Sequence, residues 1–187
     1  MIYTGPSLLL VGLMGTGKST VARQLSQQFG IDCLDTDRIV ESRSGMTVRD
    51  IFAQQGEASF RDLESDVLGE CLERQLPCVI AGAGGVVVRE ENRELINSRR
   101  AAGQLLVIWL HAVPQVLVAR TTKGAHRPLL DDDREGTLHR LANEREPLYA
   151  SVSDIIVDVS QRSVESTVSL LVEAINEDVR ERSSTDE

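Results

Sequence analysis

The stretch that decides the fold is GLMGTGKST, residues 12–20. It fits the pattern G-x-x-x-x-G-K-[ST], the phosphate-binding loop of proteins that bind nucleoside triphosphates. An almost wholly apolar run, SLLLV at residues 7–11, precedes the loop and predicts a buried parallel strand. Val21, Leu25 and Phe29 follow it at helical spacing. Strand, glycine loop and helix, in this order, are the arrangement that phosphate binding needs.

The loop predicts a nucleoside triphosphate site with a divalent cation. Its glycines let backbone N–H groups close around phosphate oxygens, at the positive end of the following helix. Lys18 reaches the β- and γ-phosphates, and the Ser19 hydroxyl is a ligand for Mg²⁺. The alternative, a glycine-rich turn that only joins a strand to a helix, is disfavoured because loop, Lys-Ser pair and flanking elements agree. The expected nucleotide-binding residues are Gly15, Thr16, Gly17, Lys18, Ser19 and Thr20.

Length and composition predict one soluble globular domain. The chain has 187 residues, of which 41% are hydrophobic and 26% charged. The formal net charge of -9 argues against nucleic acid as the partner, because binding to a phosphate backbone needs a basic surface. We find no apolar run of membrane-spanning length and no signal-peptide pattern.

The cysteines and histidines argue against disulfides and against a zinc site. Cys33, Cys71 and Cys78 are odd in number and have no C-x-x-C spacing, which predicts reduced, buried thiols in a cytoplasm. The three histidines lie far apart in the sequence, so a zinc site is not expected.

Two acids follow the second apolar run, residues 31–34. Asp35 and Asp37 stand one residue apart at the expected carboxyl end of a strand, where ligands bind in open α/β sheets. If strand geometry continues, one carboxylate faces the metal and the other a substrate. The alternative, about equally supported by the sequence alone, is that one of them caps the next helix, residues 38–42.

Arg61 and Glu64 lie three residues apart on a helix with an apolar stripe from residue 60 to residue 72. Spacing alone favours a solvated helix pair. The functional alternative is a glutamate that holds an arginine in place for an anionic ligand.

Three glycines in four residues follow the third expected strand, residues 78–81. In Gly82-Ala83-Gly84-Gly85 the missing side chains let a ligand approach the backbone closely, and a tight turn is the alternative. Residues 121–133 are polar, broken by Gly and Pro, and carry Lys123 and Arg127. They predict a mobile flap that brings positive charge to a phosphate, with an ordinary surface loop as the alternative.

Strands alternate with helices along the chain, so the fold class is α/β with a mainly parallel, five-stranded sheet. The fourth strand, residues 105–110, is apolar throughout and expected to be central, and the fifth is expected at 154–159. Pro147 should kink or end the helix that precedes this fifth strand. A last helix is expected at 163–175, followed by a disordered, charged tail at 177–187.

Five stretches, in their order and spacing, point to one family. They are GLMGTGKST at 12–20, DTD at 35–37, Gly56-Glu57 with Phe60, Arg61 and Glu64, RPLL at 127–130, and REPLY at 145–149. On these stretches the chain resembles the bacterial shikimate kinases from residue 8 to about residue 175. The resemblance implies a P-loop kinase fold in one domain, 1–176, with a substrate-binding region at about 38–72 and a lid at about 121–133.

The implied reaction is transfer of the γ-phosphate of ATP to the 3-hydroxyl of shikimate, in the biosynthesis of aromatic amino acids. The resemblance also implies Mg²⁺ as cofactor, shikimate and ATP as the small-molecule partners, no nucleic acid or membrane partner, and a cytoplasmic monomer. The alternatives are a kinase of another small polyol acid, such as gluconate or an aminated shikimate, and a non-catalytic nucleotide-binding regulator.

The resemblance assigns the acid-binding and metal-binding residues. Arg61 and Arg145 match arginines that bind the shikimate carboxylate, for which a guanidinium is a bidentate and permanently charged partner. Asp37 matches the aspartate that contacts the shikimate hydroxyls and accepts the proton. Asp35 matches the aspartate that holds Mg²⁺ through water.

Other positions match by the same resemblance. Lys18, Asp37 and Arg127 are the implied catalytic residues, and Arg127 comes from the lid to neutralise charge on the transferring phosphate. Arg120 and Arg162 match positions near the adenine and ribose. The remaining implied contacts are Glu64 to orient Arg61, Phe52 and Phe60 as walls of the ring site, and the N–H groups of Gly84 and Gly85.

One position departs from the family pattern. The family usually has three consecutive glycines after the third strand, whereas here Ala83 takes the first position and Gly82 precedes it. If the position needs a positive φ, Ala83 costs on the order of 1 kcal/mol, and otherwise the change is harmless.

Overall fold

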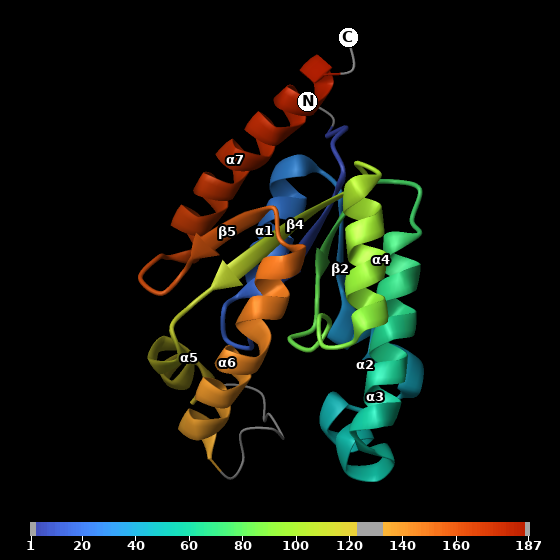
Figure 1. Ribbon diagram of the computed structural model, residues 1–187, viewed down its shortest axis with the longest axis vertical. Helices are drawn as coiled ribbons and strands as arrows, with labels where there is room; N and C mark the ends of the chain where they lie inside the picture. The colour runs from blue at the N-terminus through green and yellow to red at the C-terminus, as the bar shows by residue number, and fades with distance from the viewer. Residues whose placement is uncertain (1–2, 123–132, 186–187) are drawn as a thin grey trace.

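The computed structural model describes residues 3–122 and 133–185. Within these residues five strands alternate with seven helices (Figure 1). The strands are β1 (Ser7–Val11), β2 (Asp32–Asp35), β3 (Cys78–Ala81), β4 (Leu105–His111) and β5 (Ile155–Asp158). The helices are α1 (Lys18–Phe29), α2 (Thr36–Ser44), α3 (Val48–Leu72), α4 (Glu90–Ala101), α5 (Pro114–Thr121), α6 (Arg134–Val152) and α7 (Val164–Thr185).

The strands form one sheet in the order β2-β3-β1-β4-β5, and every pair is parallel. Leu9 of β1 lies beside Ile80 of β3 on one side and Val107 of β4 on the other. The parallel α/β prediction is therefore confirmed. The middle strand is β1 rather than the expected β4, which lies between β1 and β5.

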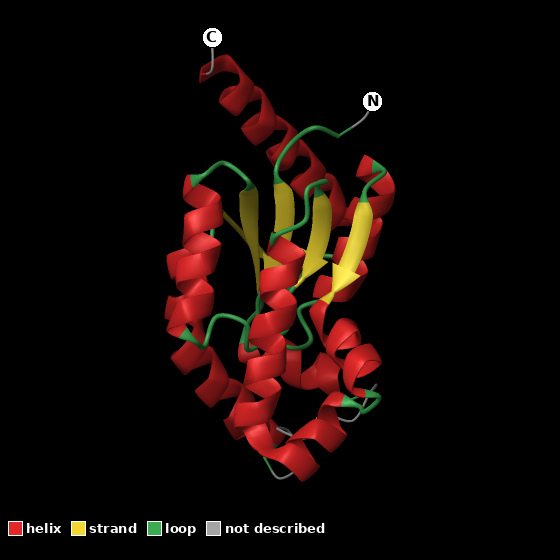
Figure 2. Cartoon of the chain, turned by 90° about the vertical axis from the view of Figure 1, so that its right-hand side faces the viewer, coloured by secondary structure: helices red, strands yellow, loops and turns green. Residues whose placement is uncertain are grey.

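Helices cover both faces of the sheet, as Figure 2 shows from the side. α1 packs against α7 on one face, while α4 and α6 pack on the other and α3 lies along α4. Both faces of β1 are covered by helices, and Leu8, Leu9 and Leu10 are fully buried. An uninterrupted apolar strand is what two covered faces require.

The carboxyl ends of the strands point to one end of the molecule, where α2, α5 and the start of α3 lie (Figures 1 and 2). Both termini lie at the opposite end. This arrangement leaves the carboxyl edge of the sheet to the loops and helix ends that carry the predicted site residues.

The helix α3 is kinked at Gly56. Gly56 has φ 84 and ψ 171, a conformation that is essentially restricted to glycine. Of the two effects predicted for Pro147, a kink or an end of the helix, the end is wrong, because α6 continues to Val152. The buried side chains of Tyr149 and Val152 hold this last part of α6 in the core.

The prediction of a disordered tail is wrong for residues 177–185, which continue α7. Two contacts explain why charged residues are helical here. Val179 packs against the hydrophobic core, and Asp178 forms an ion pair with Arg182 one helical turn later, at 2.6 Å.

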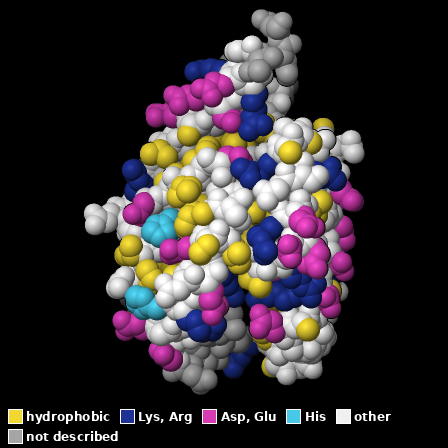
Figure 3. All heavy atoms as spheres, in the orientation of Figure 1, with side chains coloured by type: hydrophobic (Ala, Val, Ile, Leu, Met, Phe, Trp, Pro, Cys, Tyr) yellow, Lys and Arg dark blue, Asp and Glu magenta, His cyan; other side chains and the backbone are white. Residues whose placement is uncertain are grey.

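The prediction of buried thiols holds for Cys71 and Cys78 but is wrong for Cys33. Cys33 is exposed because β2 is an edge strand, paired only with β3. On the face drawn in Figure 3, acidic side chains lie over α7 and along the opposite edge, with Lys and Arg interspersed. None of the helices in the described part of the chain is both long and apolar enough to cross a membrane.

Candidate active site

A cavity of about 840 Å³ opens at the carboxyl ends of β1, β2 and β3. Its walls are the phosphate loop, the start of α2, the first half of α3 and the glycine turn, residues 82–85. Most of the predicted site residues line it: Gly15, Gly17, Lys18, Ser19, Thr20, Asp35, Asp37, Arg61, Gly84, Gly85, Arg120 and Arg145. A cavity of this size suits small ligands.

Two predicted residues do not line this cavity, and a third lies outside the described residues. Thr16 is buried beneath the phosphate loop, where its hydroxyl donates to Leu13 O at 2.8 Å. Arg162 is exposed in the segment after β5. Arg127 and most of the predicted lid, 121–133, lie outside the described residues.

The phosphate loop is braced by its own lysine. Lys18 Nζ donates to Gly12 O at 2.8 Å and to Leu13 O at 3.0 Å. Gly15 and Gly17 have φ of 87 and 93, so both need the freedom of glycine. Since α1 begins directly after Gly17, its N-terminal N–H groups are available to an anion in the loop.

Asp35 caps the helix α2, as one of the sequence alternatives predicted, and it also lines the cavity. Its Oδ1 accepts the N–H of Arg38 at 3.3 Å, which caps α2, and it lines the cavity with Ser19. A hydroxyl and a carboxylate are oxygen donors, which suit Mg²⁺ completed by phosphate oxygens and water. The described residues hold no group of three or more His, Cys, Asp or Glu side chains suited to a metal ion. Ser19 and Asp35 thus offer two oxygen donors in this cavity.

Asp37 lies in the first turn of α2 and faces the same cavity. Burial, followed by the negative charges of Glu64 and Asp35, raises its pKa to about 7, while Lys18 acts in the opposite direction. A carboxyl group with a pKa near neutrality is suited to accept a proton at physiological pH.

Arg61 and Glu64 form a buried ion pair, so the solvated-pair interpretation is wrong. Arg61 Nη1 donates to Glu64 Oε2 at 2.8 Å, and the two side chains are 7% and 1% exposed. On its other edge, Arg61 donates through Nη2 and Nε to Glu57 Oε1, at 2.9 and 3.3 Å. Three of the five N–H groups of the guanidinium are thus used, which leaves two for a ligand.

Glycine at position 85 leaves space for the guanidinium of Arg61, which lies directly against it. A Cβ on Gly85 would be 1.8 Å from Nη1 of Arg61. The φ of Gly85 is not in the left-handed region, so the requirement is for space rather than for backbone freedom.

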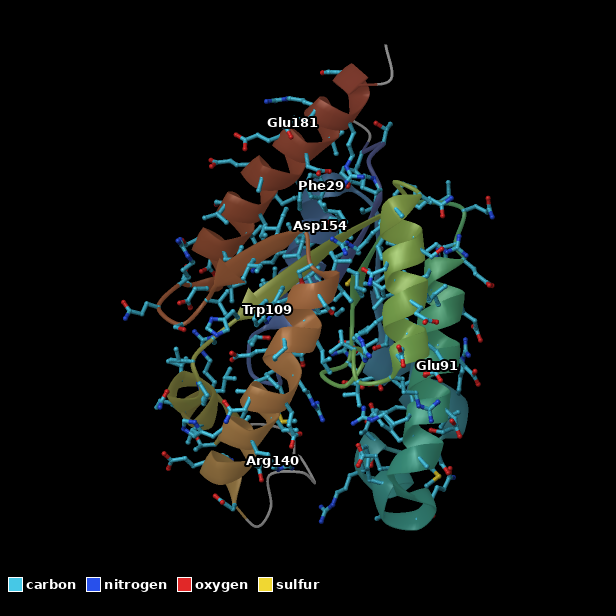
Figure 4. The ribbon with its side chains drawn as sticks, in the orientation of Figure 1. Phe29, Glu91, Trp109, Arg140, Asp154 and Glu181 are labelled. Carbon is cyan, nitrogen blue, oxygen red and sulfur yellow. The ribbon has the colours of Figure 1, made fainter. Side chains whose placement is uncertain are left out.

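Arg145 reaches the same turn from α6. Its Nη1 donates to Gly84 O at 2.9 Å, and the hydroxyl of Tyr149 donates to the same oxygen at 2.5 Å. The ring centroid of Tyr149 lies 5.8 Å from that of Trp109, a residue of β4 that is labelled in Figure 4. The glycine turn is therefore contacted by Arg61 on one side and by Arg145 on the other.

Ala83 is unstrained. No described residue other than glycine has a positive φ, so the possible cost at this position does not arise. Its N–H donates to the hydroxyl of Thr36 at 2.9 Å. The departure from three glycines thus changes a position whose N–H already has a partner within the protein.

Sequence reasoning assigned no role to Thr36, Tyr149 or Glu57, although all three lie in the stretches that carry the family resemblance. Two of them had a signal, because Glu57 and Tyr149 each lie four residues from a predicted arginine and so share its helix face. Thr36 is the middle residue of the Asp-Thr-Asp stretch and the first residue of α2, and no spacing pattern pointed to its hydroxyl.

The fold and the cavity define a class. A parallel sheet whose central strand runs into a phosphate loop is the architecture of P-loop kinases, and two buried arginines lie in the same cavity as the loop.

Residues 14–176 match the model of the family described as shikimate kinase. A shikimate kinase of Chromobacterium violaceum is 39% identical over 181 residues, which is 96% of this chain and 95% of the relative. That of a Marinomonas species is 36% identical over 172 residues, 91% of this chain and 92% of the relative. The solved structure of shikimate kinase from Acinetobacter baumannii in complex with shikimate has a TM-score of 0.86 at 32% identity, and covers 94% of this chain and 95% of that chain.

This chain belongs to the shikimate kinase family. The predicted family, fold class and activity as an ATP-dependent kinase are confirmed.

Proposed function

We propose that this protein transfers the γ-phosphate of ATP to the 3-hydroxyl of shikimate, and that it releases shikimate 3-phosphate and ADP. The observation that carries the proposal is the pair of buried arginines on the glycine turn, next to an aspartate whose pKa is about 7. Shikimate presents one carboxylate and three hydroxyls. The arginines suit the carboxylate, and the aspartate suits a hydroxyl.

Arg61 and Arg145 bind the carboxylate, because both are held at fixed positions against the turn. Arg61 keeps two N–H groups for the ligand, and the N–H groups of Gly84 and Gly85 supply further donors. Phe52 and Phe60, whose ring centroids are 4.8 Å apart, form a wall of the same cavity. Cζ of Arg61 lies 5.3 Å from the centroid of the Phe60 ring, so this wall and the arginine are joined by a cation–π contact.

Asp37 orients the 3-hydroxyl and accepts its proton as that oxygen attacks the γ-phosphorus. The bond from the γ-phosphorus to the bridging oxygen breaks, and ADP leaves with the electron pair. Lys18 contacts the β- and γ-phosphates, and Arg127 supplies positive charge from the lid. When bound to Ser19 and Asp35, Mg²⁺ would neutralise charge on the phosphate oxygens. Catalysis of this kind rests on positioning and charge stabilisation.

Arg120 contributes to the nucleotide side of the site, since it lines the cavity and its Nη2 donates to Val159 O at 2.7 Å. Arg162 is left out of the proposed site because it is exposed and does not line the cavity. We further propose that the protein acts as a cytoplasmic monomer, because one chain supplies every wall of the cavity.

The test is ADP release from Mg-ATP in the presence of shikimate, quinate, gluconate or no acceptor. We expect turnover with shikimate alone, and a loss of about 10²–10⁴ in kcat in Asp37→Asn with nearly unchanged ATP binding. Turnover with gluconate alone, or none with any acceptor despite tight ATP binding, would overturn the proposal. Unaltered kcat in Asp37→Asn would remove the role of Asp37 while leaving the substrate assignment in place.

A further inference from the structure

Thr36 separates the two aspartates of the site and is fully buried. Its hydroxyl accepts the N–H of Ala83 at 2.9 Å and donates to Ala81 O at 3.4 Å. A single side chain thus joins the first turn of α2 to the end of β3 and to the glycine turn.

This hydrogen-bonded link lies just beyond the point where β2 and β3 stop pairing. The β2–β3 ladder ends at the pair Asp35 and Ala81, because α2 begins at Thr36 and its backbone turns away. The hydroxyl of Thr36 takes the place of the next ladder bond and contacts Ala83 instead. Because β2 is at the edge of the described sheet, it has no second strand beside it that could fix this position.

Side chains from the three helices α2, α6 and α3 contact three successive residues of the glycine turn. Thr36 binds the N–H of Ala83, Arg145 and Tyr149 donate to the carbonyl of Gly84, and Arg61 lies against Gly85. The turn therefore sets where both arginines stand. Of these contacts, the one from Thr36 comes from the element that carries Asp37.

We propose that Thr36 is a positioning residue for phosphoryl transfer. Its hydroxyl fixes Asp37, which receives the proton, at a set distance from the turn that orients the acid. This inference rests on the proposed function. It assigns to Thr36 no contact with substrate or nucleotide, and it predicts an effect on kcat rather than on nucleotide binding.

Two variants separate the hydroxyl from the packing of the side chain. Thr36→Val keeps the branched shape and removes the hydroxyl, whereas Thr36→Ser keeps the hydroxyl and removes the methyl group. Thr167→Val is the matched control, because Thr167 is also buried and its hydroxyl donates to Ser163 O at 2.9 Å, within α7. In each variant kcat is expressed per nucleotide-binding site, titrated with ATP, so that unfolded protein does not count.

We expect kcat with shikimate to fall at least about tenfold in Thr36→Val, with the KM for ATP within about twofold of the parent. Thr36→Ser should keep at least a third of the parental kcat, and Thr167→Val should be unchanged. Hydrogen exchange of the Ala83 amide, measured without substrate, should be faster in Thr36→Val and not in Thr36→Ser.

Three results would overturn the inference: parental kcat in Thr36→Val, Thr36→Ser as impaired as Thr36→Val, or an equal loss in Thr167→Val. An unaltered exchange rate at Ala83 in Thr36→Val would also overturn it, because the link would then be absent. Failure of the parent protein to phosphorylate shikimate is a different outcome, which refutes the proposed function itself.

Discussion

Replacement of Gly85 by alanine tests how closely the glycine turn lies against the buried arginine. The new Cβ would be 1.8 Å from Nη1 of Arg61, where ordinary contacts begin at 3.4 Å, so the guanidinium must retreat by about 1.6 Å. The retreat itself is sterically easy, since this is the end of a flexible side chain. Its consequence is the loss of the 2.8 Å bond to Glu64.

The magnitude follows from the burial of Glu64. Its Oε1 already has no hydrogen-bond partner, and loss of Arg61 would leave Oε2 without one as well. Breaking a buried ion pair by removing one partner costs about 3–5 kcal/mol. We expect the lower end, about 3 kcal/mol, because Arg61 keeps Glu57 and stays nearby. In a domain of this size that lowers Tm by about 6–12 °C.

The effect should depend on pH in a defined direction. Burial raises the pKa of Glu64, and Arg61, Arg145 and Arg89 oppose that rise. Withdrawal of Arg61 therefore raises the pKa further. A carboxyl group whose pKa is higher in the folded than in the unfolded state favours folding as pH falls. The Tm deficit of Gly85→Ala should thus be larger at pH 8 than at pH 5.5.

Ligand-free thermal unfolding at both pH values provides the measurement. Gly84→Ala is the control, because a Cβ there meets Met14 N at 3.6 Å, an ordinary contact, and its φ is not in the left-handed region. It should stay within about 2 °C of the parent. The reasoning is refuted if Gly85→Ala matches the parent at pH 8, or if Gly84→Ala loses as much.

Three further predictions concern the arginine site and the kink in α3. Arg61→Lys keeps the positive charge but loses the planar guanidinium, which can bind a carboxylate through two N–H groups. The KM for shikimate should therefore rise at least about tenfold, with the KM for ATP unchanged. An unaltered KM for shikimate would contradict a carboxylate-binding role. Tyr149→Phe removes one of two donors to the carbonyl of Gly84 and should cost about 1 kcal/mol in chemical unfolding with a few-fold higher KM for shikimate. Tyr3→Phe, a loss of a hydroxyl far from the cavity, should leave the kinetics unchanged, and equal kinetic effects of the two tyrosine variants would refute the role of Tyr149. In Gly56→Ala the new Cβ meets no atom within 4 Å, but alanine must adopt a φ of 84. Chemical unfolding should therefore report a loss of about 1–3 kcal/mol in the free energy of unfolding. Full stability would show that the kink does not require glycine.

The strands were predictable because a parallel sheet covered on both faces needs uninterrupted apolar runs. Residues 7–11 and 78–81 match β1 and β3. The edge strand β2 is displaced by one residue from its prediction, because pairing with β3 begins at Asp32 and continues to Asp35, which lies beside Ala81. The end of α7 was not predictable from its charged composition, because contacts of Val179 with the rest of the fold decide it.

The site was predictable through the family resemblance rather than through spacing. Asp37, Arg61 and Arg145 were assigned in this way, and the structure brings them to one cavity. Thr36 and Tyr149 were missed because their partners are backbone groups of the glycine turn, 47 and 65 residues away in the chain. No spacing within the sequence encodes a contact between a hydroxyl and a distant backbone atom.

The central position of β1 has a consequence for how the chain is made. β1 is synthesised first, yet both of its partners in the sheet, β3 and β4, lie far downstream, at Cys78–Ala81 and Leu105–His111. At about 5–20 residues per second, β1 has no strand beside it for roughly 3–13 s of synthesis. During this interval the apolar run of β1 is unpaired, so a nascent chain should depend on the ribosome surface or a chaperone to keep residues 7–11 from associating with other chains.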